Sequence, residues 1–227
     1  MDWYFVGVDF GQSRDFTAIA GVERAETKGD WDPVMFAWKK AVSLQVRYLE
    51  RVPLGTSYPD VVKRVVEVAR SRDLTGRCRM AVDGTGVGRA VVDLLRKGQP
   101  GCVVMAVNIT SGMKQTQEGG YYGVPKRDLL VGLQVLLQRG LLRIAAGLEH
   151  GRDLVKEMEA VQVKISLSGH EQFGAWREGT HDDLVFAVAL ACWNAQNAYP
   201  NDPVGREQWW TSKQQADAAR VFLKKRE

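Results

Sequence analysis

The sequence predicts a single α/β domain built around a mixed β-sheet, and three observations lead to this class. First, strand-like segments fill the first 52 residues with no helical pattern between them, which is typical of an antiparallel meander. Second, residues 58–107 alternate two amphipathic helical patterns with two short apolar strands, which is typical of parallel strands joined by crossovers. Third, 227 residues with 45% hydrophobic content can bury a core without disulfides or a structural metal.

The first half of the chain holds the expected meander and the start of the parallel part. Aromatic and β-branched side chains predict strands at residues 3–9, 17–22, 34–38 with 43–52, 78–83 and 102–107. Apolar residues at helical spacing predict helices at residues 58–71 and 86–97. Pro59 suits the first turn of the earlier helix. We expect the strand at 78–83 to lie beside the first strand.

The second half begins with a glycine-rich polar segment, residues 108–124, which is too long for a simple connection and is therefore expected to be functional or mobile. Helices are predicted at residues 125–139, 148–161 and 180–195, and a hairpin at 163–167 and 171–176 that turns at Ser168-Gly169. Beyond Tyr199 the chain is polar and ends basic. We therefore expect one domain over residues 1–198 and a tail over residues 199–227.

Composition excludes several classes of protein. No apolar run approaches the roughly 20 residues that a membrane-spanning helix needs, and the first residues have no basic region of the kind that opens a signal peptide. Cys78, Cys102 and Cys192 are far apart in apolar runs, which favours buried free thiols in a reducing compartment. The net charge of +4 permits nucleic-acid binding without arguing for it.

Four aspartates stand where they could converge. Asp9 and Asp83 end two predicted strands, and each is followed within two residues by glycine. Asp182 and Asp183 begin a helix whose next nine residues are apolar on every side, so this helix should be buried. Ligand sites in such sheets lie just outside the carboxyl ends of the strands. The doublet would therefore point from the edge of the core toward the two strand ends.

Converging carboxylates repel one another and are tolerated when a cation neutralises them. Mg²⁺ and Mn²⁺ prefer oxygen ligands, and two such ions about 4 Å apart can activate water and stabilise the leaving oxygen of a phosphodiester. Each aspartate also has a structural explanation, as a turn residue before glycine or as an acid at a helix N-terminus. The joint pattern favours a metal site.

Four stretches together resemble the nuclease domain of bacteriophage terminase large subunits. They are VGVDFGQSRDFTAIAGVE, MAVDGTGVGRAVVDLLR, VPKRDLLVGLQVLLQRGLLRI and GTHDDLVFAVALACW, in the family's order, and the resemblance covers residues 3–196. It implies an RNase H-like fold related to RuvC resolvases. It also implies a metal-dependent endonuclease that cuts phage DNA, with little sequence preference, at the start and end of packaging.

Carried over by residue, the resemblance makes Asp9 and Asp83 the first two metal-binding carboxylates. The third would be Asp183, with Asp182 as an auxiliary ligand, although the sequence does not order the two. Asp15 matches an acidic position after the family's first strand and could act behind the metal ligands or serve as a turn residue. His181 could act behind the ligands or as a proton shuttle, and is not expected to bind metal directly.

The resemblance also predicts DNA contacts and partners. Lys114, Lys126, Arg127 and Lys164 are candidate phosphate contacts. The segment 108–124 could form a flap over the cleavage site. Expected partners are double-stranded DNA and, in the full system, a terminase ATPase domain, small subunit and portal, in the host cytoplasm and outside the virion. The isolated domain is expected to be a monomer without membrane contact.

The chain departs from full terminase large subunits because it contains no GxxxxGK[ST] phosphate-binding stretch. We therefore expect the nuclease part alone, cut from a longer protein, without ATP hydrolysis. Three alternatives remain open. They are a RuvC-like junction resolvase, a nucleotide-binding fragment related to actin and Hsp70, and a non-catalytic DNA-packaging assembly module.

Overall fold

The computed structural model describes residues 3–11, 15–86, 88–165, 171–175 and 181–199. An eight-stranded mixed sheet forms its centre, in the order β6-β7-β5-β4-β1-β2-β3-β8. Its strands are β1 (Trp3–Asp9), β2 (Thr17–Asp32), β3 (Ala37–Val52), β4 (Cys78–Asp83), β5 (Val103–Thr110), β6 (Thr116–Glu118), β7 (Tyr121–Pro125) and β8 (Leu142–Ile144). The helices are α1 (Tyr58–Ala69), α2 (Gly88–Lys97), α3 (Lys126–Gln138), α4 (Gly151–Ala160) and α5 (Asp183–Ala198). A separate two-stranded sheet pairs β9 (Val161–Ile165) with β10 (Glu171–Ala175).

The sheet confirms the predicted change from antiparallel to parallel strands. β1, β2 and β3 form the antiparallel meander. β4 then returns to the other side of β1 and runs parallel to it, with Val8 opposite Val82. β5 and β7 continue the parallel part. Because β1 and β4 are parallel neighbours, their carboxyl ends lie at the same edge of the sheet.

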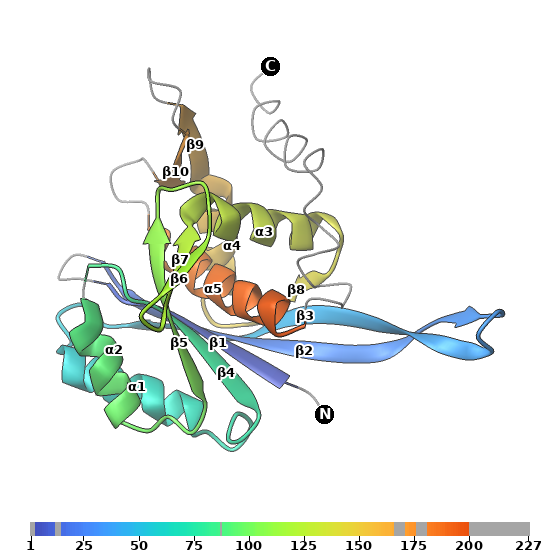
Figure 1. Cartoon of the computed structure of the whole chain (residues 1–227), viewed down its shortest axis with the longest axis horizontal. Helices are drawn as coiled ribbons and strands as arrows, with labels where there is room; N and C mark the ends of the chain where they lie inside the picture. Colours follow the sequence, from blue (N-terminus) through green and yellow to red (C-terminus); the bar gives the residue numbers. More distant parts are fainter. Residues whose placement is uncertain (1–2, 12–14, 87, 166–170, 176–180, 200–227) are drawn as a thin grey trace.

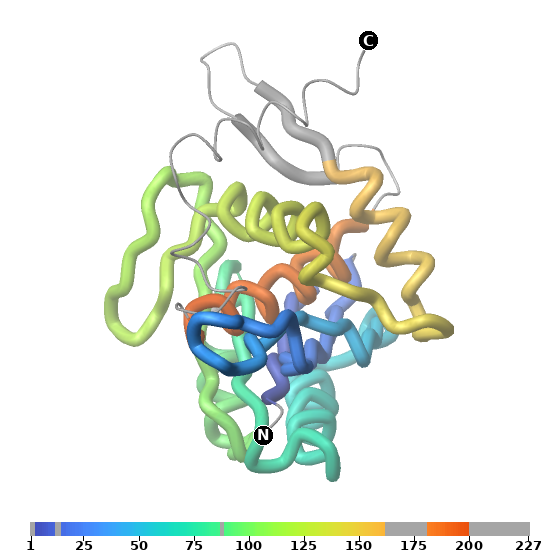
Figure 2. Tube along the Cα trace, turned by 90° about the vertical axis from the view of Figure 1, so that its right-hand side faces the viewer, coloured from blue at the N-terminus to red at the C-terminus, as the bar shows by residue number. Residues whose placement is uncertain are grey.

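Helices cover both faces of this sheet (Figure 1). α1 and α2 bury their apolar faces against one side, in a core that includes Val8, Ile19, Met80 and Val82. On the other side α5 lies on β1, β2 and β4, and α3 and α4 pack on α5. The same layering is visible from the side, where α5 runs between the sheet and α3 (Figure 2). This position explains why α5 is apolar all round and buried from Asp183 to Gln196.

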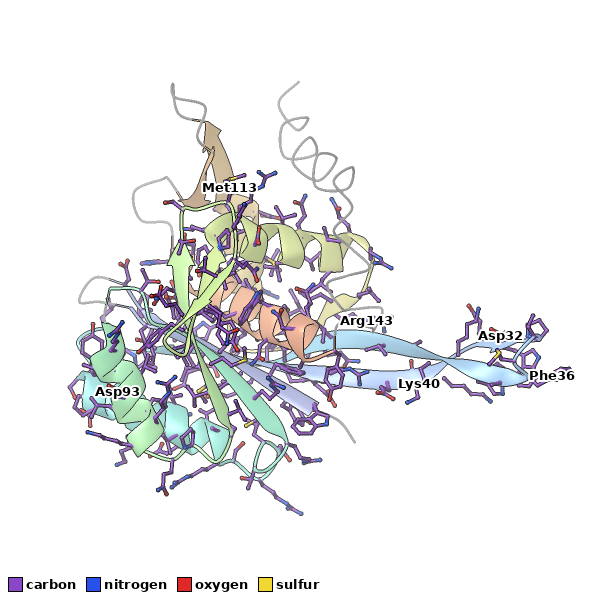
Figure 3. The ribbon with its side chains drawn as sticks, viewed as in Figure 1. Asp32, Phe36, Lys40, Asp93, Met113 and Arg143 are labelled. Atoms are coloured by element: carbon purple, nitrogen blue, oxygen red, sulfur yellow. The ribbon has the colours of Figure 1, made fainter. Side chains whose placement is uncertain are left out.

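The outer parts of β2 and β3 leave the body as a long two-stranded arm (Figure 1). Trp31 and Trp38 face each other across it, with ring centroids 5.4 Å apart. Asp32 accepts hydrogen bonds from the backbone N–H groups of Val34 (2.9 Å) and Met35 (3.1 Å), which fixes the turn. Phe36 stands exposed at the tip (Figure 3). The expected strand at 34–38 is therefore wrong for residues 34–36, which lie in the turn, while residues 37 and 38 begin β3. The expected strand at 17–22 is too short, because β2 continues to Asp32.

The second half contains strands that the sequence did not predict. Residues 108–124 are not a plain loop, because most of them extend β5 or form β6 and β7. The short strand β8 was not predicted, and it pairs with β3 after the end of α3. The predicted hairpin is confirmed as β9 and β10, whereas its expected turn at Ser168-Gly169 and residues 200–227 of the expected tail lie outside the described residues. The division into a domain and a tail stays a prediction.

No helix within the described ranges has both the length and the apolar character needed to cross a bilayer. The thiols of Cys78 and Cys192 are buried and that of Cys102 is half-buried, and all three are free.

Candidate metal centre

The carboxyl ends of β1 and β4 carry Asp9 and Asp83 side by side. Val8 pairs with Val82 in the parallel register, so each aspartate follows a paired, fully buried residue on an adjacent strand. Both aspartates are half-buried. The predicted neighbourhood of the two strand ends is therefore confirmed by the topology.

Asp9 lies in a field of negative charge. Burial raises its pKa well above the ordinary value, and the carboxylates of Asp83, Asp182 and Asp183 raise it further, in that order. The Lys126 ammonium acts in the opposite direction. The four aspartates singled out in the sequence thus influence one site electrostatically, as their predicted positions require.

Asp83 is fixed by the loop that follows β4. The backbone N–H of Thr85 donates a 2.8 Å hydrogen bond to Asp83 Oδ1, and Thr85 Oγ1 accepts a 2.7 Å hydrogen bond from the N–H of Ile109 on β5. Burial raises the pKa of Asp83, while Thr85 lowers it. The DGTG segment therefore orients a carboxylate as well as forming a turn.

The two members of the doublet have different surroundings. Asp182 precedes α5, its side chain is 31% exposed, and its Oδ2 lies 3.5 Å from Lys126 Nζ. The Asp183 side chain is 5% exposed, and Arg51 Nε donates a 2.9 Å hydrogen bond to its Oδ2. Its other oxygen, Oδ1, is buried and accepts no hydrogen bond from the described residues. His181 Nδ1 is 3.8 Å from that oxygen.

Glu157 of α4 is the second acid that contacts Arg51, and we call Arg51, Asp183 and Glu157 the Arg51 network. One of its carboxylate oxygens contacts the Arg51 guanidinium, and the other accepts a 3.1 Å hydrogen bond from the backbone N–H of Val185. Burial raises the pKa of Glu157 to about 7, and the nearby charge of Asp183 adds to the increase. Arg51 therefore bridges two buried acids that belong to different helices.

The remaining predicted residues lie in the connection after β1, between β5 and β6, on α3 and on β9. Asp15 is exposed in the connection from β1 to β2. Lys114 is exposed between β5 and β6, and Arg127 lies beside Lys126 in the first turn of α3. Lys164 lies in strand β9, and its side chain is outside the described part of the structure. Of the predicted phosphate contacts, Lys126 forms an ion pair with Asp182 of the doublet.

Within the described residues, no three His, Cys, Asp or Glu side chains lie close enough together to form a ready-made metal site. Instead, two cations engage the doublet: Lys126 at Asp182 and Arg51 at Asp183. The free, buried Oδ1 of Asp183 and the mutual repulsion at Asp9 are both features that a cation would relieve. The oxygen donors suit a hard divalent ion.

Sequence reasoning missed Arg51 and Glu157. The sequence does contain a signal for each of them. Glu157 interrupts an apolar stripe at helical spacing, formed by Leu154, Met158 and Val161. Arg51 follows the inward-facing Leu49 at strand spacing. A charged residue on an inward-facing position indicates a buried partner.

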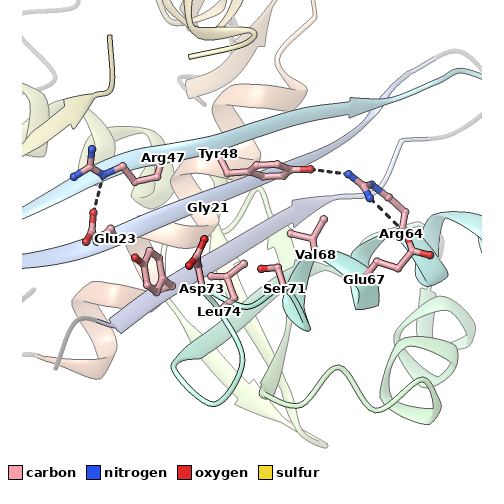
Figure 4. Close-up of a pocket in the computed structure, with 11 residues that line it drawn as sticks. Gly21, Glu23, Arg47, Tyr48, Arg64, Glu67, Val68, Ser71, Asp73 and Leu74 are labelled. Carbon is pink, nitrogen blue, oxygen red and sulfur yellow. Dashed lines mark hydrogen bonds and ion pairs between the residues drawn. The ribbon is translucent and has the colours of Figure 1, made fainter. Parts of the chain in front are cut away.

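A separate pocket of about 650 Å³ lies between α1 and the strands β2 and β3 (Figure 4). Both arginines that line it bond to other lining residues. Arg47 Nε donates to Glu23 at 2.6 Å, and the Arg64 guanidinium donates to the Tyr48 hydroxyl at 3.1 Å. None of the predicted site residues lines it. The candidate site is therefore the carboxylate cluster and not this pocket.

The strand order, with a helix that begins with two acids packed on the central strands, defines the fold class. It is an RNase H-like fold, as the sequence predicted. No protein-family model matches the chain, and no curated protein matches its sequence.

Several solved structures share this fold. The large terminase nuclease of thermophilic phage G20c matches with a TM-score of 0.58 at 21% identity, over 84% of this chain and 81% of that one. The nuclease domain of the large terminase of Thermus phage P74-26 matches with a TM-score of 0.57 at 18% identity, over 88% and 82%. That of bacteriophage SPP1, with bound Mn, matches with a TM-score of 0.51 at 13% identity, over 85% and 86%. The chain thus has the fold of terminase nuclease domains.

Proposed function

We propose that this chain is a divalent-metal-dependent endonuclease that cuts double-stranded DNA, as the nuclease part of a phage genome-packaging terminase. One observation carries the proposal: Asp9 and Asp83 end two adjacent parallel strands, and the charges of the Asp182–Asp183 doublet act on Asp9, in a fold shared with terminase nuclease domains. The proposed partners are double-stranded DNA and, in the full system, a terminase ATPase domain, small subunit and portal, in the host cytoplasm.

The proposed cofactor is Mg²⁺ or Mn²⁺, as one or two ions held by Asp9, Asp83, Asp183 and Asp182. Structures of the phage G20c nuclease with bound magnesium and with bound cobalt also match this chain, with TM-scores of 0.57 and 0.56. In this chain, Asp183 Oδ1 supports the assignment because it is a buried acceptor without a hydrogen bond from the described residues.

When bound, such ions supply an activated water and stabilise the leaving oxygen of the cleaved phosphodiester. The chain's own residues orient these ligands: Thr85 fixes Asp83, and Arg51 holds one oxygen of Asp183. Lys126 and Arg127 offer positive charge to phosphate oxygens. Because phosphate contacts carry no base information, we propose cleavage with little sequence preference.

The test is plasmid cleavage by the purified chain with Mn²⁺ or Mg²⁺ and with EDTA. The expected result is nicking and linearisation with either metal and none in EDTA. Asp9→Asn and Asp83→Asn should each reduce the cleavage rate at least about a thousandfold, since each removes a charged metal ligand. A matched control is Asp93→Asn, an exposed acid on α2 that pairs only loosely with Arg96 at 3.9 Å.

Two outcomes would contradict the proposal. Undiminished cutting by folded Asp9→Asn and Asp83→Asn variants would exclude the metal site. Cutting restricted to four-way junctions, with linear duplex left intact, would favour a junction resolvase. Circular dichroism and thermal unfolding establish that each variant is folded before its activity is compared.

A further inference from the structure

Arg51 is a buried cation that touches more than the one oxygen of Asp183 it holds. It lies near the end of β3, opposite Ala18 of β2, and its side chain is 15% exposed. Its guanidinium contacts Asp183 and Glu157 and lies 5.2 Å from the centre of the Phe16 ring. An arginine buried to this extent is costly unless its charge is paired and its donors are bonded. Asp183 and Glu157 therefore hold the Arg51 guanidinium in place, and the guanidinium in turn restrains both carboxylates.

We propose that Arg51, held by Glu157, is a positioning residue that sets the orientation of Asp183 for binding a divalent cation. The inference rests on the proposed function, because it assigns Asp183 as a metal ligand. Arg51 Nε occupies Asp183 Oδ2 at 2.9 Å and leaves Oδ1 unbonded among the described residues. One oxygen is thereby used for orientation and the other is kept for the ion.

The geometry separates the roles of the two members of the doublet. Asp182 is 31% exposed and its cation, Lys126, is 33% exposed at 3.5 Å, so this pair can exchange partners with water or a ligand. Asp183 and Arg51 are 5% and 15% exposed at 2.9 Å, so this pair has little freedom to rearrange. Asp183 is accordingly the preorganised ligand and Asp182 the adaptable one.

Glu157 acts on Asp183 through Arg51. Its two carboxylate oxygens contact the Arg51 guanidinium and the backbone N–H of Val185, which lies in the first turn of α5. Glu157 therefore anchors both the guanidinium and the start of the helix that carries Asp183. Removal of its charge should loosen Arg51 without removing any group that touches the ion.

The experiment measures Mn²⁺ binding to the full chain by titration calorimetry without DNA, alongside unfolding in EDTA and cleavage. Arg51→Gln should weaken Mn²⁺ binding about 10–100-fold, the range typical when a residue behind a metal ligand is removed. Glu157→Gln should weaken it in the same direction by a smaller factor. Excess Mn²⁺ should restore most of the lost cleavage, because the ligands themselves remain.

Arg51→Lys and Arg47→Gln are the comparison variants. Arg51→Lys keeps the charge but loses the fork that spans two acids, so it should recover only part of the affinity. Arg47 lies on the same strand, is bonded to Glu23 at 2.6 Å, and has no contact with the doublet among the described residues, so Arg47→Gln should bind Mn²⁺ like the unchanged chain.

The outcomes are distinguishable. If the unchanged chain binds Mn²⁺ and cuts DNA but both Arg51→Gln and Glu157→Gln bind Mn²⁺ equally well, the positioning role is overturned and the proposed function stands. If both variants lose only thermal stability in EDTA, Arg51 is structural and the inference is equally overturned. If the unchanged chain neither binds Mn²⁺ nor cuts DNA, both proposals fail. Should Arg51→Gln not fold, Glu157→Gln and Arg51→Lys decide the question by the same titration.

Discussion

Gly7 of β1 lies so close to Ala187 of α5 that a methyl group on Gly7 would meet the Ala187 carbonyl oxygen at 1.8 Å. In the sheet, Gly7 stands between Ala20 on β2 and Ala81 on β4. A row of three small residues thus crosses three strands beneath the helix. This row lets α5 approach the sheet closely, and α5 in turn carries the Asp182–Asp183 doublet to the ends of β1 and β4.

Gly7→Ala should therefore be one of the most damaging small substitutions in the chain. The added methyl group would meet backbone on a buried helix and not a movable side chain, so we expect a loss of about 3 kcal/mol or more in the free energy of unfolding. Urea denaturation followed by circular dichroism measures it. Gly112→Ala is the control, because the nearest atom to its added methyl, Thr110 Oγ1, is at an ordinary 3.6 Å. Equal urea midpoints for the two variants would show that α5 does not depend on this contact.

The elements that form the core could be predicted from the sequence because their apolar residues follow helical or strand spacing. The buried helix α5 and the strands β1 and β4 are of this kind, and so the positions of Asp9, Asp83 and the doublet followed from them. The resemblance to terminase nucleases then added the fold, which the structural matches confirm.

The arm could not be predicted, because its strands are held by cross-strand pairs and not by a core. Residues such as Glu26, Lys28 and Lys40 have the composition of a loop, and nothing in the local sequence states that β2 continues to Asp32. The Arg51 network escaped prediction for a different reason. Arg51 is 106 residues from Glu157 and 132 residues from Asp183 in sequence, so their pairing depends on tertiary structure alone.

Lys126 gives a prediction in which metal binding and cleavage change in opposite directions. Its ammonium lies 3.5 Å from Asp182 Oδ2 and 4.4 Å from the centre of the Phe186 ring, and so competes with an incoming cation for the doublet. Lys126→Gln should therefore bind Mn²⁺ a few-fold more tightly at low salt. It should also cut DNA about tenfold more slowly, because a charge available to phosphate is lost.

Calorimetry and plasmid cleavage at saturating Mn²⁺ measure these two effects. Lys63→Gln, an exposed lysine on α1 at the opposite face of the sheet, should change neither quantity. A Lys126→Gln variant with weaker Mn²⁺ binding would mean that the lysine supports the carboxylates instead of competing for them.

Phe36 at the arm tip is a second site where stability should change in a defined direction. Its φ of 47° lies in the left-handed region, which is unfavourable for a bulky side chain, and the residue is 80% exposed. Phe36→Asn should stabilise the chain by about 0.5 kcal/mol, because asparagine tolerates this conformation and no buried contact is lost. Met35→Asn, at an exposed neighbour with an ordinary φ, should bring no such gain. Thermal unfolding compares the two, and a lower melting temperature for Phe36→Asn would contradict the expectation.

The ion pairs of Glu26 with Arg24 and Lys40 in the arm should depend on pH. Hydrogen bonds from Arg24, and then from Lys40 across the arm, lower the pKa of Glu26 to about 2. A carboxyl group whose pKa is depressed on folding contributes stability above its unfolded pKa of about 4.3, and this contribution is lost as the pH falls through the folded value. The three-residue pairing should therefore persist at pH 4 and disappear near pH 2.

NMR titration of the Glu26 carboxyl carbon reports the midpoint directly. Lys40→Gln should raise that midpoint, whereas Lys39→Gln should not, because Lys39 pairs with Asp32 at 3.6 Å. A Glu26 midpoint at the ordinary value of glutamate would show that the arm is not held by these charges in solution.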